Sequence, residues 1–287
     1  MKLNFKMVTL AALAMLAGGA QAAVANSTAG SSMGNSSLLF VAVDVNSNAG
    51  LVIDLGLSMS DFTNVPSAAL PQGNWNFATD STSFGSATGN SWSAAYNSFK
   101  SAQSGGDLLW GVVAGDQVTG AVSATNPIAG RGLLATGNPT AANMTSVTLA
   151  GPTGTALTNF SLFVATAANL GTMTTANNGA AATTSANGEA WLPVRMGDKF
   201  GGSLAWSYLL ANGAVSNFQW QQNLTANPVV FQLGNPTATD SLAASPLTFS
   251  FDIATNTLVA AVPEPSTYAM LIAGLVAVGF MARRRQA

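Results

Sequence analysis

Carboxylates are the side chains of this chain that are best suited to chemistry. Asp44, Asp54, Asp107 and Asp116 lie near the ends of short apolar runs that predict strands. Two carboxylates held at a suitable separation are the machinery of glycoside hydrolysis. Acids at strand ends are more often turn residues facing solvent, so this pattern favours structural roles and predicts no catalytic residue.

The absence of two residue types excludes several kinds of catalytic and metal site. The chain contains no histidine and no cysteine. It therefore cannot assemble a Ser-His-Asp or Cys-His catalytic group, a zinc site of cysteine and histidine, or a disulfide. We expect no cofactor, and we expect stability to come from a hydrophobic core and from backbone pairing.

One stretch begins like a calcium-binding loop. Asp44, Asn46 and Asn48 have the alternating oxygen ligands of such a loop. The sixth position is Ala49 rather than glycine, and the twelfth is Leu55 rather than glutamate. The sequence therefore predicts a polar hairpin turn, with weak calcium binding as the alternative, and no metal site is assigned.

The tryptophans are the remaining candidates for ligand contact. Trp92, Trp110 and Trp206 occur at spacings that face a core. Trp75 and Trp191 stand in loop-like contexts, and we expect them to be exposed indole faces available for glycan contact. They motivate one functional hypothesis, a carbohydrate-binding β-sandwich module.

The elements that position these residues are mainly strands. Residues 37–45 and 51–57 predict a hairpin whose first strand is buried on both faces. Residues 90–102 have the spacing of an amphipathic helix. Residues 247–253 alternate between apolar and polar side chains, and residues 257–262 complete a hairpin with them.

Other stretches are less decisive. Residues 157–170 fit either a strand or a helix, because short apolar runs do not discriminate between the two. Residues 203–210 and 214–221 predict a second hairpin. Residues 173–187 are of low complexity and are the best candidate for an exposed loop or a domain boundary.

Many short strands with few helices predict a mainly β fold. We expect a β-sandwich or jelly-roll-like body over residues 26–262, with one or two short helices, and a single transmembrane helix after it. The whole chain has 9 basic and 11 acidic residues. The basic residues of the body are Lys100, Arg131, Arg195 and Lys199. A body this poor in cations has no electrostatic footprint for nucleic acid.

The first 25 residues have the pattern of a secretory signal peptide. Lys2 and Lys6 precede an apolar run over residues 7–16. The small residues that fit cleavage sites are Ala20, Ala22, Ala23 and Ala25. The sequence therefore predicts export through the Sec machinery and cleavage by signal peptidase.

The other end of the chain joins a stiff peptide to an apolar stretch. Pro263 and Pro265 fix φ, and each proline also pushes the residue before it toward extended geometry. An extended peptide is the form in which an enzyme can grip a backbone. Residues 268–282 carry no charge and would reach about 22 Å as a helix, a short span for about 30 Å of hydrocarbon.

Three arginines end this apolar stretch: Arg283, Arg284 and Arg285. Positive residues next to a span stay on the cytoplasmic side, so they act as a topological stop and place the body on the far side of the membrane. An ordinary tail anchor with a proline-rich lead-in is the simpler alternative.

The order of these parts resembles the PEP-CTERM sorting domain of Gram-negative bacteria. The resemblance implies that Pro263, Glu264 and Pro265 are the recognition element of an exosortase, a membrane transpeptidase that removes the tail. It implies a body first anchored to the inner membrane on its periplasmic side, then released to the cell surface or the extracellular space. We therefore expect a non-catalytic surface or matrix protein whose neighbourhood is exopolysaccharide and biofilm.

Overall fold

The computed structural model describes the body through most of its strands and helices. The described residues are 36–63, 70–84, 89–104, 108–116, 132–137, 152–174, 178–195, 209–223, 228–231 and 247–262. The longer strands are β1 (Ser37–Asp44), β2 (Ala49–Ser58), β6 (Leu108–Asp116), β7 (Gly132–Thr136), β8 (Asn178–Thr183), β10 (Val215–Asn223), β12 (Thr248–Asp252) and β13 (Thr257–Ala261). The shorter strands are β3 (Gly73–Asn76), β4 (Ser81–Thr82), β5 (Asn90–Ser91), β9 (Leu210–Ala211) and β11 (Pro228–Phe231). The helices are α1 (Ser60–Thr63), α2 (Ser93–Ala102), α4 (Pro152–Ala167), α5 (Leu192–Arg195) and the 3-10 helices η2 (Gly171–Thr174) and η3 (Ser185–Ala190).

All these strands belong to one hydrogen-bonded sheet. Its order is β4-β3-β13-β12-β10-β7-β6-β1-β2-β8-β5, with β11 paired to β10 and β9 paired to β6. The hairpin of β1 and β2 lies inside the sheet, between β6 and β8, and β1 is buried along its whole length. The predicted hairpin, the buried first strand and the helix that begins after Trp92 are therefore confirmed.

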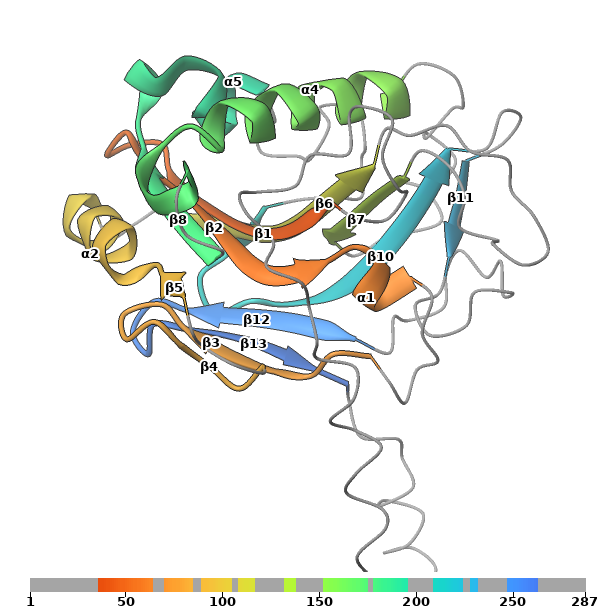
Figure 1. Cartoon of the computed structure of the whole chain (residues 1–287), viewed down its shortest axis with the longest axis horizontal. Coiled ribbons are helices and arrows are strands. Elements are labelled where there is room, and N and C mark those ends of the chain that lie inside the picture. The colour runs from red at the N-terminus through yellow and green to blue at the C-terminus, as the bar shows by residue number, and fades with distance from the viewer. Residues whose placement is uncertain are drawn as a thin grey trace, which may run out of the picture.

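The sheet folds over at β10. The first residues of this strand, Val215 to Asn217, pair with β12, and the following residues, Phe218 to Gln222, pair with β7. The strands β12, β13, β3 and β4 consequently form a second layer beneath β1, β2 and β6 (Figure 1). The mainly β prediction is confirmed, but the body is one nearly closed, barrel-like sheet rather than a sandwich of two.

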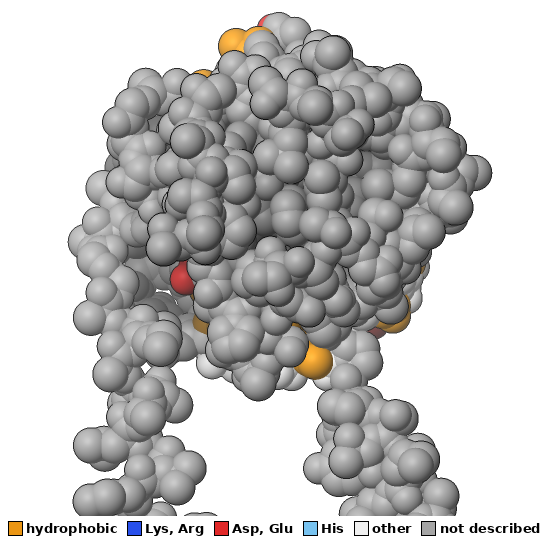
Figure 2. All heavy atoms as spheres, turned by 90° about the vertical axis from the view of Figure 1, so that its right-hand side faces the viewer, with side chains coloured by type: hydrophobic (Ala, Val, Ile, Leu, Met, Phe, Trp, Pro, Cys, Tyr) orange, Lys and Arg blue, Asp and Glu red, His pale blue; other side chains and the backbone are white. Residues whose placement is uncertain are grey.

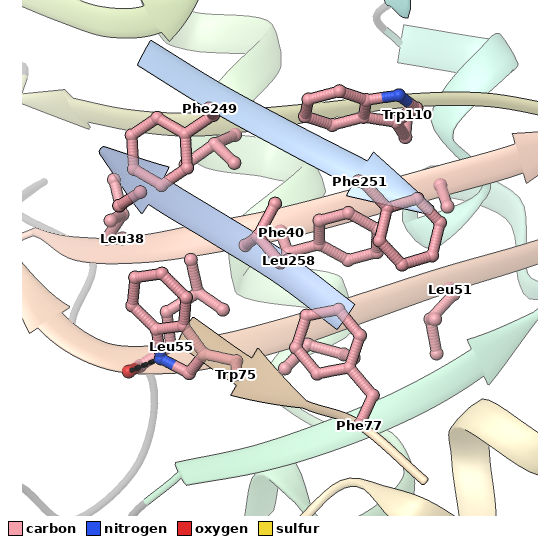
Figure 3. Close-up of a cluster of buried hydrophobic side chains, with 14 of the residues drawn as sticks. Leu38, Phe40, Leu51, Leu55, Trp75, Phe77, Trp110, Phe249, Phe251 and Leu258 are labelled. Atoms are coloured by element: carbon pink, nitrogen blue, oxygen red, sulfur yellow. Dashed lines mark hydrogen bonds between the residues drawn. The ribbon is translucent and has the colours of Figure 1, made fainter. Parts of the chain in front are cut away.

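The main core fills the space between the two layers. Phe40 from β1 meets Phe251 from β12 and Phe77 at ring-centroid distances of 4.8 Å each (Figure 3). These rings come from three separate parts of the chain and are essentially inaccessible to solvent. Aromatic pairs of this kind add about 0.5–1.5 kcal/mol to the free energy of burial, so they bind the two layers to each other.

A second core lies on the outer face of the upper layer. Phe160, Phe163 and Val164 of α4 pack onto the side of β1 that faces away from the main core. Figure 1 shows α4 and α5 lying over this face. Since helices cover one face and the folded sheet covers the other, β1 needs apolar residues on both sides, as its sequence predicts.

The two edges of the sheet approach each other at Asp80. The Asp80 carbonyl oxygen accepts a hydrogen bond from Asn90 Nδ2 at 3.0 Å, which joins the β4 edge to the β5 edge. Its carboxylate accepts the backbone N–H groups of Trp92 and Ser93 at 2.6 and 2.7 Å, and also the Ser93 hydroxyl. Asp80 thereby caps α2 from a distance in sequence and helps to close the barrel.

One expectation about local structure is wrong. Residues 173–187 contain β8, an interior strand of the sheet, rather than only an exposed loop. Of the second predicted hairpin, residues 203–208 lie outside the described residues; residues 210–211 pair with β6, and β10 pairs with β7, β11 and β12. The ambiguous range 157–170 is resolved as helix by α4.

Candidate functional site

The site with the clearest functional meaning is the point where the chain leaves the sheet. β13 is paired on both edges: with β12 from Thr257 to Ala261, and with β3 from Thr257 to Ala260. Leu258 and Ala260 point into the main core and are buried. β13 is therefore an interior strand that the body holds firmly up to its last residue.

Two polar side chains hold the end of β13 in place. Thr248 Oγ1 donates to the Ala261 carbonyl oxygen at 3.1 Å, and Val262 N–H donates to Gln72 Oε1 at 3.3 Å. We call these four residues, Gln72, Thr248, Ala261 and Val262, the exit rim. None of them is charged, Gln72 is exposed and the other three are half-buried.

The exit rim joins residues that are far apart in sequence. Thr248 comes opposite Ala261 through the register of the β12–β13 hairpin, which the alternating pattern of β12 predicts. Gln72 arrives from 190 residues away, through the pairing of β3 with β13. Sequence reasoning missed Gln72 because no local pattern links it to the end of the chain.

Several residues singled out from the sequence lie outside the described residues. They are Ala20, Ala22, Ala23 and Ala25 at the front, and Pro263, Glu264, Pro265, Arg283, Arg284 and Arg285 at the back. The expected span over residues 268–282 is also outside them. Among the residues that are described, no helix has both the length and the apolar character needed to cross a membrane.

Trp75 is not an exposed platform. It belongs to β3, has no accessible surface and stacks on Phe84 at a centroid distance of 4.4 Å. Its Nε1–H donates to the Leu55 carbonyl oxygen at 3.0 Å, the dashed bond in Figure 3. The prediction of an exposed glycan contact at Trp75 is therefore wrong, because the indole fills the core and satisfies a backbone acceptor.

Trp191 is buried as well, with 5 % of its surface exposed. It follows η3 and belongs to the second core beneath α4. A Cβ atom at Gly50 would lie only 2.8 Å from Cζ3 of this ring, so the indole packs directly on the β2 backbone. The prediction of exposure at Trp191 is also wrong.

The carboxylate of Asp44 is occupied by hydrogen bonds from within the body. Asp44 Oδ1 accepts from Ser47 N–H at 3.1 Å, and Asp44 Oδ2 accepts from Ser104 N–H and Oγ at 3.0 and 2.9 Å. Burial raises the pKa of Asp44, but these hydrogen bonds outweigh it and hold the pKa below its ordinary value. The geometry is that of a polar hairpin turn, as predicted for the stretch that begins at Asp44, and both carboxylate oxygens are engaged.

Asp54 is in a different state. It is buried beside the bulge of β2, where Gly56 N–H and Ser37 Oγ donate to its two oxygens at 2.9 and 3.2 Å. Burial raises its pKa to about 7, and the two hydrogen bonds only partly oppose that shift. Within the described residues no group of three or more acidic side chains could hold a metal ion.

Figure 2 shows the described side chains on one face of the molecule. Its described surface side chains include hydrophobic and acidic ones, and no described lysine or arginine appears there. The described part of the body thus presents no basic patch on this face.

Comparison with known proteins assigns the segment that begins at the exit rim. Residues 261–285 match the PEP-CTERM protein-sorting motif. No curated protein and no solved structure matches the chain. The matched range begins at Ala261, the last residue of β13, and includes Pro263, Glu264 and Pro265. By this match over its C-terminal residues, the chain is a PEP-CTERM domain-containing protein.

Proposed function

We propose that this chain is a non-catalytic surface or extracellular-matrix protein that a signal peptide exports and an exosortase releases from the membrane. The observation that carries the proposal is the PEP-CTERM motif, which starts where the body's last strand ends. A folded body followed directly by a sorting segment is the arrangement expected of cargo that is delivered intact.

The hydrogen bonding of the acids supports a structural body rather than an enzyme. Asp44 fixes a hairpin turn, Asp80 caps α2, and Asp61 accepts from the N–H and hydroxyl of Ser58 at 2.7 and 3.0 Å. Each of these three carboxylates accepts hydrogen bonds that fix a turn or a helix end. These aspartates act as turn and cap residues, which is the role that strand-end acids commonly have.

The composition of the body supports a destination. The body is acidic and poor in charge, and it is rich in hydroxyl and amide side chains that hydrogen-bond to polyols. We propose exopolysaccharide, in a biofilm or envelope polymer, as its neighbourhood. The alternative of a dedicated carbohydrate-binding module loses the residues that motivated it, because Trp75 and Trp191 both lie in cores.

Cell fractionation with and without the exosortase tests the proposal. The full chain should leave the membrane fraction, with a loss of mass, only when the enzyme is present. Glu264→Ala should keep the chain at full mass in the membrane, whereas Glu189→Ala, which changes the other glutamate of the chain, should not. Release of the Glu264→Ala chain at the normal rate, or release without the enzyme, would contradict the proposal.

A further inference from the structure

The recognition element begins immediately outside the folded body. β13 ends at Ala261 and Val262 is still held by Gln72, so Pro263 is the first residue beyond the exit rim. Consecutive Cα atoms are about 3.8 Å apart, and three extended residues span at most about 11 Å. A recognition element of three residues that follows Val262 therefore cannot reach more than about 11 Å from it.

An enzyme cannot bind the backbone of β13 unless the body unfolds. An enzyme that grips an extended peptide needs free backbone N–H and C=O groups. Those of β13 are used by β12 on one edge and by β3 on the other, and its Leu258 side chain is in the core. The peptide available to an enzyme accordingly starts after Val262, whose N–H is held by Gln72, and the enzyme must bind it close to the exit rim.

We propose that the exit rim is part of the docking surface for the exosortase, so that the enzyme contacts Gln72 and Thr248 of the folded body as well as the sorting peptide. An enzyme that encloses three residues of a peptide is much wider than the distance of about 11 Å between that peptide and the rim. Such an enzyme therefore also contacts the rim. This inference rests on the proposed function, since it requires that an exosortase processes the chain.

The chemistry of the rim suits such a contact. It offers the exposed amide of Gln72 and the half-buried hydroxyl of Thr248, and it has no charge that would have to be stripped of water when the surfaces meet. The opposite end of the hairpin provides a natural control. The turn at residues 253–256 joins β12 to β13 at the far end of the same two strands, and Thr255 there is exposed.

The experiment uses the absence of cysteine in the chain. Gln72→Cys and Thr255→Cys each give the full-length precursor a single thiol, which is labelled with a bulky polyethylene glycol maleimide. Each precursor is then incubated with exosortase in proteoliposomes, and tail removal is followed by intact mass. Unlabelled samples of both variants give the reference rates.

The inference predicts loss of tail removal when position 72 carries the polymer, and an unchanged rate when position 255 carries it. Equal rates for the two labelled chains would overturn it. A second variant tests the cause. A flexible Gly-Ser insert of about twelve residues between Val262 and Pro263, with an average span of about 20 Å, should restore cutting of the chain labelled at position 72.

The two failures can be told apart. If the insert does not restore cutting, crowding at the rim is not the reason for the loss, and the inference is overturned. If the exosortase fails to cut even the unlabelled chains, the proposed function itself is overturned, together with the inference that rests on it.

Discussion

The indole nitrogens of Trp75 and Trp92 satisfy acceptors that the sheet leaves open. Pairing of β2 with β8 ends at Ile53, and the β1–β2 register shifts at a bulge that contains Gly56 at φ +73°. The carbonyl oxygens of Asp54 and Leu55 follow, and they accept from Trp92 and Trp75 at 3.0 Å each. These tryptophans are structural because unpaired backbone acceptors in a core are costly.

Replacement of Trp75 should therefore reduce stability rather than ligand binding. We expect Trp75→Ala to lower the free energy of unfolding by about 3–5 kcal/mol, since it empties a buried site and leaves the Leu55 carbonyl without a donor. Urea unfolding of the purified body measures this. Val215→Ala, at a side chain that is 62 % exposed, should change stability by no more than about 0.5 kcal/mol. Similar midpoints for the two variants would contradict the structural role.

Asp54 should give the body an unusual pH dependence. Its carboxyl has an ordinary pKa of 3.8 in the unfolded chain and a pKa of about 7 in the folded one. Between these values the folded state holds the extra proton, so stability should fall as the pH rises from about 4 to 7 and then level off. Asp54→Asn, which mimics the protonated form, should remove that decline.

Asp44 provides the contrasting control for this titration. Its pKa is lowered in the folded state, so its contribution is present above pH 3.8 and is lost as the pH falls further. Asp44→Asn should therefore leave the decline between about pH 4 and 7 intact. Urea midpoints across the pH range decide the matter, and a decline that persists in Asp54→Asn would assign it to another group.

At the scale of elements, sequence patterns predicted a strand correctly where it pairs with the next strand of the chain, or where one or both of its faces are uniformly buried. The alternation of β12 and the apolar run of β1 both predict their strands. β8 was missed because its small residues look like loop sequence. Gly179 lies so close to η2 that an added Cβ would approach the Met173 backbone to 2.5 Å, and Ala180 and Ala181 face the two cores. Tight packing from both sides, which no local pattern records, selects these residues.

The capping of α2 by Asp80 should be measurable as a property of that helix. Asp80→Ala removes an acceptor of the Trp92 and Ser93 N–H groups and puts a less suitable residue at φ +54°. We expect a loss of about 1–2 kcal/mol. Asp80→Asn, which keeps one oxygen and tolerates this φ, should lose less. Equal losses in thermal or urea unfolding would show that the cap contributes nothing.

β13 should decide whether the body folds. A chain that stops after Asp252 lacks the strand between β12 and β3, along with the buried Leu258 and Ala260. We expect it to lose cooperative unfolding by circular dichroism, whereas a chain that stops after Val262 should keep it. A cooperative transition in the shorter chain would contradict the interior role of β13.

At the scale of the whole molecule, the sorting motif and the β class were predictable, but the barrel-like closure was not. The motif is read from adjacent residues, Pro263 to Pro265, and needs no folded context. Closure depends on the bend at β10 and on contacts such as Gln72 with Val262, which span nearly the whole body. The exposure of Trp75 and Trp191 was misjudged for the same reason, because turn-like neighbours say nothing about which distant strands cover them.

The intact mass of the chain, recovered from cells that contain or lack the exosortase, tests the account most directly. With the enzyme, the product should lack the signal peptide near Ala22 or Ala25, lack the tail, and still contain β13 through Val262. Without the enzyme, the tail should remain. A product that keeps its tail in the presence of the enzyme, or that ends inside residues 257–261, would contradict the account.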